Sequence, residues 1–178
     1  VRLDAPEHLL TREDDSTAVG QRRAAWAGRY RRRNGSSEVP SASAGEGVAR
    51  TLKGGFATTI MAGKPARVAD EPQSVGGTDT GPTPYDLLAA ALAACTTMTL
   101  QMYARRKGLD LGSAAAHVTH GRVHADDCDD CEQSDGRVHE FRRELVLNGN
   151  LSAAQRQRML EIADRCPVHR TLHHEIKI

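Results

Sequence analysis

The sequence has few aromatic residues, little net charge and only four cysteines. Trp, Tyr and Phe make up 3% of the 178 residues, too few rings for a surface that stacks on unpaired bases. The formal net charge is only +1, so no overall charge attracts nucleic acid or an anionic membrane surface. We therefore expect no nucleic acid and no membrane among the partners.

The first residues lack the apolar run of a signal peptide, because Arg2, Asp4 and Glu7 stand there instead. Residues 87–104 carry no charge, but they are mainly Ala, Thr and Leu and too weakly apolar for a membrane span. A helix buried in a protein core is the better interpretation. We expect a cytoplasmic protein in which the cysteines do not form a structural disulfide framework.

Composition divides the chain into three parts. Residues 1–33 form a separate segment, with a helix that begins at Asp15 or Ser16 and ends near Tyr30. Residues 34–47 are rich in Ser, Gly and Ala and are typical of a linker. From Val48 onward the pattern predicts strands over residues 48–53, 55–62 and 66–69, followed by a loop over residues 70–82.

The clearest local signal is a helix over residues 84–107. Thr83 is a good N-cap, Pro84 suits the first helical position, and Asp86 completes a capping box. Three basic residues and Gly108 mark its end. One face at helical spacing carries Leu88, Leu92, Cys95, Thr99 and Met102, so we expect Cys95 on the core side of this helix.

Two strands, over residues 114–124 and 137–147, are expected on either side of an acidic loop. Ser152 and Gln155 form a second capping box, which opens a helix that runs to about Arg165 and is stopped by Pro167. Cys166 lies on the apolar stripe of that helix, and a last strand is expected over residues 174–178. This order of elements predicts an α+β domain.

Cys95 and Cys166 admit two interpretations from pattern alone. Buried cysteines are common, so both could be inert core thiols. A reactive thiolate would need a nearby cation or hydrogen-bond donor, for which Arg67, Arg165 and His169 are candidates.

Two motifs carry a family resemblance. The run GGTDTGPTPYDLLAAALAACT, residues 76–96, is followed later by IADRCPVHRTL, residues 162–172. Both resemble the OsmC/Ohr family, and in detail its OsmC-like branch, over about residues 48–178. The resemblance implies antiparallel sheets wrapped around a long central helix, in an intertwined homodimer.

The resemblance also implies a chemistry. Cys95 would be the peroxidatic cysteine, which reduces an organic hydroperoxide and becomes a sulfenic acid. Cys166 would resolve that sulfenic acid as a disulfide, and an external dithiol of the lipoyl type would reduce the disulfide, with no bound cofactor. The predicted place of Cys166 at a helix C-terminus, where the helix dipole disfavours a thiolate, suits the resolving role.

The sequence departs from the Ohr branch at the residues that activate the thiol. Tyr85 stands where that branch has a Glu, and its early Gly-Gly-Arg motif is missing. Glu71 (with its neighbour Asp70) and Asp86 could replace the acid, and Arg67 could replace the Arg; with His169 they are the candidate activating and substrate-pocket residues. The alternative function is a dimer that binds a small apolar ligand and has little peroxidase activity.

Cys128 and Cys131 form a single C-x-x-C motif among acidic residues. One such motif is a weak metal signal, although His120, His124 and His139 flank it. We expect a solvated loop with no bound metal. A divalent cation site and a redox pair are the alternatives.

Residues 1–33 carry a different resemblance. LDAPEHLL, residues 3–10, and the later Ala24-Ala25-Trp26 are similar to the C-terminal end of an α/β-hydrolase, with His8 at the position of the triad base. A triad also needs a serine on a G-x-S-x-G elbow, which this sequence lacks. We therefore interpret residues 1–33 as a hydrolase-like remnant with no catalytic role.

Overall fold

The computed structural model describes residues 41–64, 66–124 and 137–178, and residues 42–178 form one compact unit. The hydrolase-like segment with His8 and the C-x-x-C motif lie outside the described residues. The domain boundaries at residues 33/34 and 47/48 therefore stay predictions.

The first sheet is a small antiparallel one with the order β1-β2-β3, formed by β1 (Val48–Thr51), β2 (Thr58–Met61) and β3 (Arg67–Ala69). All three strands were predicted, but β2 begins at Thr58 instead of residue 55. Gly54 has a φ of +95°, which belongs to a turn, so the chain reverses there before pairing resumes. A 3-10 turn, η1 (Gln73–Val75), lies in the loop that follows.

The long helix α2 (Pro84–Lys107) has the bounds that the sequence predicts. The Thr83 side chain accepts a hydrogen bond from the Asp86 N–H, and the Asp86 side chain accepts one from the Thr83 N–H, so the capping box is complete. Gly108 ends the helix in the left-handed conformation, with a φ of +63°.

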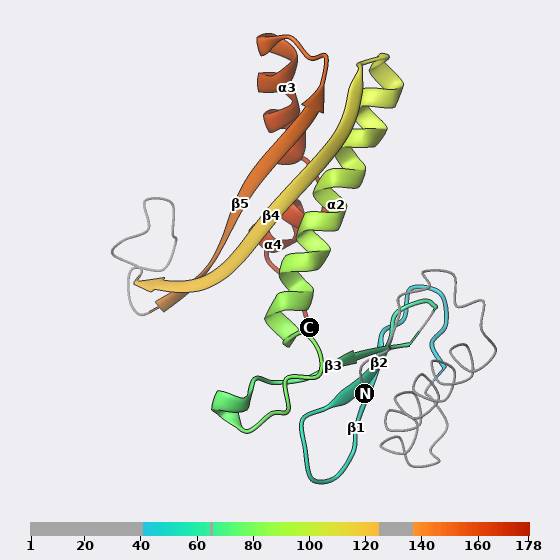
Figure 1. Ribbon diagram of the computed structural model, residues 1–178, viewed down its shortest axis with the longest axis vertical. Helices are drawn as coiled ribbons and strands as arrows, with labels where there is room; N and C mark the ends of the chain where they lie inside the picture. The colour runs from blue at the N-terminus through green and yellow to red at the C-terminus, as the bar shows by residue number, and fades with distance from the viewer. Residues whose placement is uncertain (1–40, 65, 125–136) are drawn as a thin grey trace, which may run out of the picture. The chain divides into compact units, whose positions relative to one another are not determined.

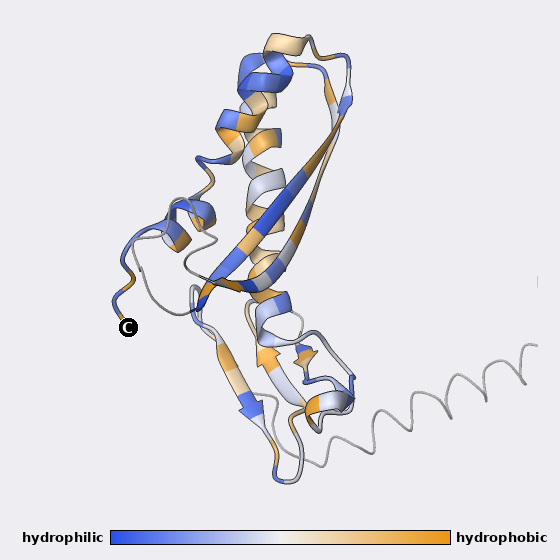
Figure 2. Cartoon of the chain, turned by 90° about the vertical axis from the view of Figure 1, so that its left-hand side faces the viewer, coloured by the Kyte–Doolittle hydropathy of each residue, from blue (hydrophilic) through white to orange (hydrophobic). Residues whose placement is uncertain are grey.

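A long antiparallel hairpin follows, made of β4 (Leu111–His124) and β5 (Arg137–Gly149). Figure 2 shows apolar and polar residues alternating along its strands, as expected for a ribbon with one covered face. The half-buried positions of β5 include Phe141, Leu145 and Leu147, and also two charged residues, Glu140 and Arg143.

Figure 1 shows α2 and α3 (Ala153–Ala163) on one side of this hairpin, with the short helix α4 (Pro167–His173) against α2. Leu100 and Met159 are fully buried and join the two long helices in one core. Burial of such side chains contributes about 1.5–3 kcal/mol each, so this core fixes α2 against α3.

Two predictions about the C-terminal part are wrong. Residues 174–178 form no strand, and Cys166 does not lie at the end of a helix. Helix α3 ends at Ala163, and Cys166 is extended, with a φ of −64° and a ψ of 139°, as the N-cap of α4. The cause is Pro167, which disfavours the helical conformation for the residue before it and suits the first position of a new helix.

The buried face of α2 differs from the predicted one. In the single chain the buried residues are Ala89, Leu92, Thr96, Leu100 and Ala104, whereas Leu88 and Met102 are 43% and 72% exposed. Helical spacing could not select the face, because α2 has small or apolar residues around most of its circumference. Cys95 consequently lies at the edge of the buried face and is half-buried.

Among the described residues, α2 is long and apolar enough to cross a membrane by length and composition alone. That test is weak evidence, because core helices also pass it. The contacts of α2 with β4, α3 and α4 agree with the prediction of a core helix.

Candidate redox site

The two candidate cysteines are free and differ in exposure. Cys95, in the middle of α2, is half-buried, while Cys166 is fully buried. The Cys166 sulfur accepts hydrogen bonds from the His169 N–H at 3.3 Å and from the Thr96 hydroxyl at 3.7 Å. Because Thr96 directly follows Cys95 in α2, the second contact ties the Cys166 sulfur to the helical turn that carries Cys95.

The new position of Cys166 reverses one electrostatic expectation. We placed this thiol at the negative end of a helix dipole. It lies instead at the start of α4, where the first backbone N–H groups are unpaired and one of them donates to the sulfur. The electrostatic argument that supported the resolving role of Cys166 therefore no longer applies.

His169 is the one candidate activating residue that reaches a cysteine, and it does so through its backbone. Its ring packs against the ring of His173 in a tilted arrangement, with 4.4 Å between the ring centroids and 36° between the ring planes. Burial lowers the pKa of the His169 imidazole, and the nearby charges of His173 and Arg143 lower this pKa further.

Asp86 is engaged in capping α2. Hydrogen bonds from the hydroxyl and backbone N–H of Thr83 lower the pKa of its carboxyl group, so it is a carboxylate at neutral pH. Its role in the described structure is to stabilise the first turn of α2.

Arg67 and Glu71 lie before the loop that leads to α2. Arg67 is exposed on β3, and Glu71 is half-buried just after that strand. Within residues 41–178 as described, no hydrogen bond links Arg67, Glu71 or the further candidate Arg165 to either cysteine. Their activating roles stay predictions.

Asp70 organises the loop before α2. Its buried carboxylate accepts hydrogen bonds from the backbone N–H groups and hydroxyls of both Thr78 and Thr80, and from the Glu71 N–H. The Thr78 hydroxyl is the largest cause that lowers the Asp70 pKa far below its ordinary range. The loop is also tight at Gly77, where a Cβ atom would overlap the Glu71 carbonyl.

Sequence reasoning missed Arg143, a charged residue beside the buried cysteine. It lies on β5 with a side chain only 13% exposed, and it donates to the Thr96 hydroxyl at 3.3 Å. A signal was present, because Arg143 occupies the same alternate positions as Phe141, Leu145 and Leu147. A cation in an apolar register predicts a buried polar contact.

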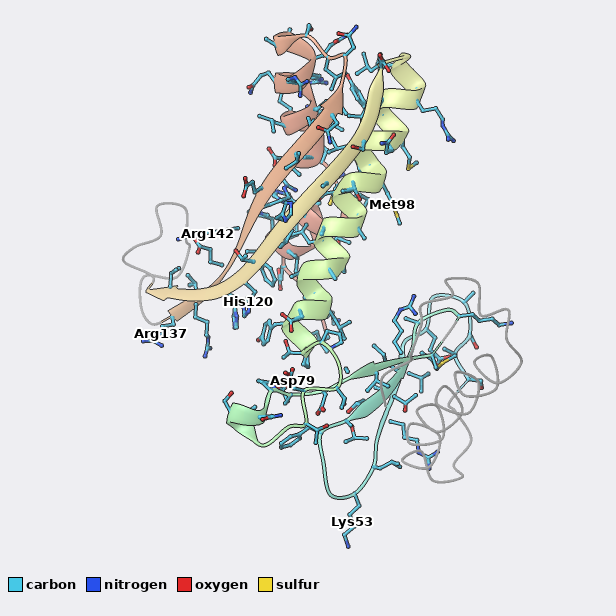
Figure 3. All side chains as sticks on the ribbon, viewed as in Figure 1. Lys53, Asp79, Met98, His120, Arg137 and Arg142 are labelled. Atoms are coloured by element: carbon cyan, nitrogen blue, oxygen red, sulfur yellow. The ribbon has the colours of Figure 1, made fainter. Side chains whose placement is uncertain are left out.

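A ring cluster lies near the start of α2, formed by Tyr85, His120, His139 and Phe141. The rings of Tyr85 and His120 are nearly parallel, with centroids 4.1 Å apart. His120 Nε2 and His139 Nδ1 are 2.9 Å apart, a hydrogen-bond distance. His120, which lies on β4, is labelled in Figure 3. In the part of the chain that the structure describes, no three His, Cys, Asp or Glu side chains gather as a metal site would require.

The antiparallel sheets and the long helix α2 define an α+β fold, and a comparison identifies the family of the chain. A family model described as OsmC-like protein matches residues 77–178. The chain therefore belongs to the OsmC-like family. A comparison with curated proteins gives no match.

Solved structures share the fold at low sequence identity. A Psychrobacter arcticus protein, whose name refers to osmotic stress and a detoxification response, is 21% identical, with a TM-score of 0.57 over 76% of this chain and 91% of its own. An OsmC-like protein of Mycoplasma pneumoniae is 20% identical, with a TM-score of 0.57 over 72% and 86%. An organic hydroperoxide resistance protein of Elizabethkingia anophelis is 18% identical, with a TM-score of 0.56 over 79% and 94%. These likenesses confirm the predicted α+β OsmC-like fold.

Proposed function

We propose that this protein reduces organic hydroperoxides through Cys95 and Cys166. The observation that carries the proposal is the contact between the Cys166 sulfur and the hydroxyl of Thr96, the residue next to Cys95. This contact holds the Cys166 sulfur against the helical turn of α2 that carries Cys95. Solved structures with this fold include proteins named for organic hydroperoxide resistance, which supports the same chemistry.

The proposed reaction has three steps. The Cys95 thiolate attacks the distal peroxide oxygen, which breaks the O–O bond and gives an alcohol and a Cys95 sulfenic acid. The Cys166 thiol then attacks the Cys95 sulfur, so an S–S bond forms and the hydroxyl leaves as water. An external dithiol of the lipoyl type reduces the disulfide by exchange and is itself oxidised to a disulfide.

The exposures of the two sulfurs support this division of roles. A bulky hydroperoxide can approach Cys95, which is half-buried, whereas Cys166 is fully covered. A buried thiol suits the second step, because its reaction partner is another residue of the same protein.

The proposal includes a cytoplasmic homodimer. Several large apolar side chains of α2 are exposed in the single chain, which is unusual for the central helix of a finished core. Tyr85, Leu88, Met98 and Met102 are 43%, 43%, 64% and 72% exposed. Figure 3 shows Met98 pointing outward from α2. A second copy that covers this face would bury these side chains and enclose the approach to Cys95.

The test is the intact mass of the protein after one equivalent of cumene hydroperoxide. The wild type should lose the mass of two hydrogen atoms, as oxidation of two thiols to a disulfide requires. Cys95→Ser should not react, and Cys166→Ser should stop at a sulfenic acid that dimedone labels. Hydrogen peroxide should react more slowly, because Ala91, Leu92 and Met98 give the surroundings of Cys95 an apolar character. If both variants react like the wild type, the peroxidase proposal is wrong, and the small-ligand-binding module takes its place.

A further inference from the structure

Thr96 behaves differently from the other threonines of α2. The hydroxyls of Thr97 and Thr99 donate to backbone carbonyls of the preceding turn, at 3.0 and 2.8 Å. That is the usual arrangement of a threonine inside a helix. The Thr96 hydroxyl instead donates to the Cys166 sulfur, and the Thr96 side chain is fully buried. Some other group must hold it in this orientation.

That group is Arg143. Its guanidinium donates to the Thr96 hydroxyl at 3.3 Å and to the Ala163 carbonyl at 3.1 Å, and it forms an ion pair with Asp164 at 2.5 Å. The three partners belong to α2, to the last residue of α3 and to the C-cap that follows it. One side chain of β5 thus fixes the start of the segment that carries Cys166 against the helix that carries Cys95.

We propose that Arg143 is a positioning residue for the resolving thiol, acting on Cys166 through Thr96. This inference rests on the proposed function, since it concerns the second step of that reaction. A hydroxyl has one proton to donate. Because Arg143 donates to the Thr96 oxygen, the Thr96 proton stays directed at the sulfur of Cys166. Without Arg143, the hydroxyl would turn to a carbonyl of its own helix, as those of its neighbours do.

The step that this arrangement serves is disulfide formation. The Cys166 sulfur must approach the Cys95 sulfur from the side opposite the hydroxyl, in line with the S–O bond that breaks. The proton of the Cys166 thiol leaves with the hydroxyl as water. Small errors of position slow such a reaction between two held groups. Formation of the sulfenic acid does not involve Cys166, so it should not depend on Arg143.

Two variants separate positioning from folding. Arg143→Gln removes the cation and its fork of donors, and Thr96→Val removes the hydroxyl while keeping the shape of the side chain. In rapid-quench experiments with cumene hydroperoxide, both should slow formation of the Cys95–Cys166 disulfide at least about tenfold, a change of about 1.4 kcal/mol in the barrier. In a Cys166→Ser background, neither should change the rate of dimedone-trapped sulfenic acid. Thr96→Ser should restore disulfide formation.

Arg142→Gln is the matched control, because Arg142 is the neighbouring residue on β5, is 74% exposed and pairs with Glu140. It should react like the wild type. If Arg143→Gln slows the two steps equally, or if Thr96→Ser fails to restore the second step, Arg143 has only a structural role and the inference is wrong.

Oxidation by diamide tests the same geometry without a peroxide. Diamide takes two hydrogens from a pair of thiols and becomes a hydrazine, so it forms the disulfide whether or not the protein is a peroxidase. Arg143→Gln should slow this disulfide at least about tenfold relative to the wild type and Arg142→Gln. Equal rates in all three proteins would overturn the inference alone. An unreactive wild type toward peroxide, with the diamide difference present, would overturn the proposed function alone.

Discussion

At the scale of single residues, Asp70 in the loop before α2 and Asp86 in the first turn of α2 hold the local backbone. Asp70 accepts five hydrogen bonds from its own loop, and Asp86 caps a helix. Such contacts stabilise the ionised form of a carboxyl group. The loop and the start of α2 are therefore held by two carboxylates, which become weaker hydrogen-bond acceptors when they are protonated.

Asp70→Asn should lower the melting temperature at pH 7, because an amide cannot accept all five hydrogen bonds. The pKa of Asp70 is lower in the folded protein than in the unfolded chain. Its contribution is therefore complete above the unfolded value of about 3.9, and it is lost as the pH falls from there through the folded value. Thermal unfolding followed by circular dichroism at about pH 5 and about pH 3 measures this loss, and the variant should lose less stability over this range than the wild type.

Asp79→Asn is the control for this loop. Asp79 is exposed and has a φ of +54°, which Asn tolerates well. It should leave both the melting temperature and its pH dependence unchanged. An equal effect of the two substitutions on the melting temperature would show that the hydrogen bonds of Asp70 do not stabilise the fold.

The residues of the site were predicted unevenly from sequence, for a physical reason. Cys95, Cys166 and the capping role of Asp86 follow from motifs that are local in the chain. Arg143 was missed because its importance lies in contacts with α2 and with the end of α3, which no local pattern contains. Its place in the apolar register of β5 was the only sequence signal.

At the scale of elements, the core between α2 and α3 fixes the scaffold of the site. Leu100 is fully buried and lies one turn beyond Thr96, where it joins the core that contains Met159. Leu100→Ala should therefore cost about 2–5 kcal/mol of unfolding free energy, measured by urea denaturation.

The neighbouring substitution Gln101→Ala is the control, because Gln101 is exposed on the same helix. It should change the unfolding free energy by less than about 0.5 kcal/mol. Similar values for the two variants would mean that the α2–α3 core is not where the stability of this domain lies.

The elements show where sequence prediction succeeds. The bounds of α2 were predicted because caps mark both of its ends. The helix α4 was missed because Pro167 carries two meanings, the end of one helix or the first residue of the next, and a single sequence does not choose between them. The face of α2 was misplaced because a helix with small residues all round has no periodic signal.

At the scale of the whole molecule, the exposed apolar face of α2 predicts self-association. Light scattering at micromolar concentration should give the mass of a dimer. Met98→Glu combined with Met102→Glu should shift the protein toward a monomer or toward aggregates, because two charges would have to be buried in the interface. Arg142→Gln should remain dimeric. A monomeric wild type would contradict this prediction.

The C-x-x-C motif lies outside the described residues and gives a separate prediction. Replacing Cys128 and Cys131 together by Ser should leave the rate of peroxide reduction nearly unchanged, because acidic neighbours disfavour their thiolates. A coupled assay with a dithiol reductant measures this rate, and metal analysis of the purified wild type accompanies it. Loss of most of the activity, or a stoichiometric metal in the wild type, would show that the motif has a function.

The Cys166 sulfur caps α4, and in the proposed reaction the same atom would also be a reactant. Once it is bonded to Cys95, the same atom is a poorer acceptor for the His169 N–H, so the first turn of α4 loses part of its support. Oxidation of Cys166 and the local stability of α4 are then thermodynamically linked, because both depend on the Cys166 sulfur. Amide hydrogen exchange at His169 and Arg170 should accordingly be faster in the disulfide form than in the reduced form, and exchange in the middle of α3 should not change. In effect, the protein would display its redox state in the local stability of its last helix.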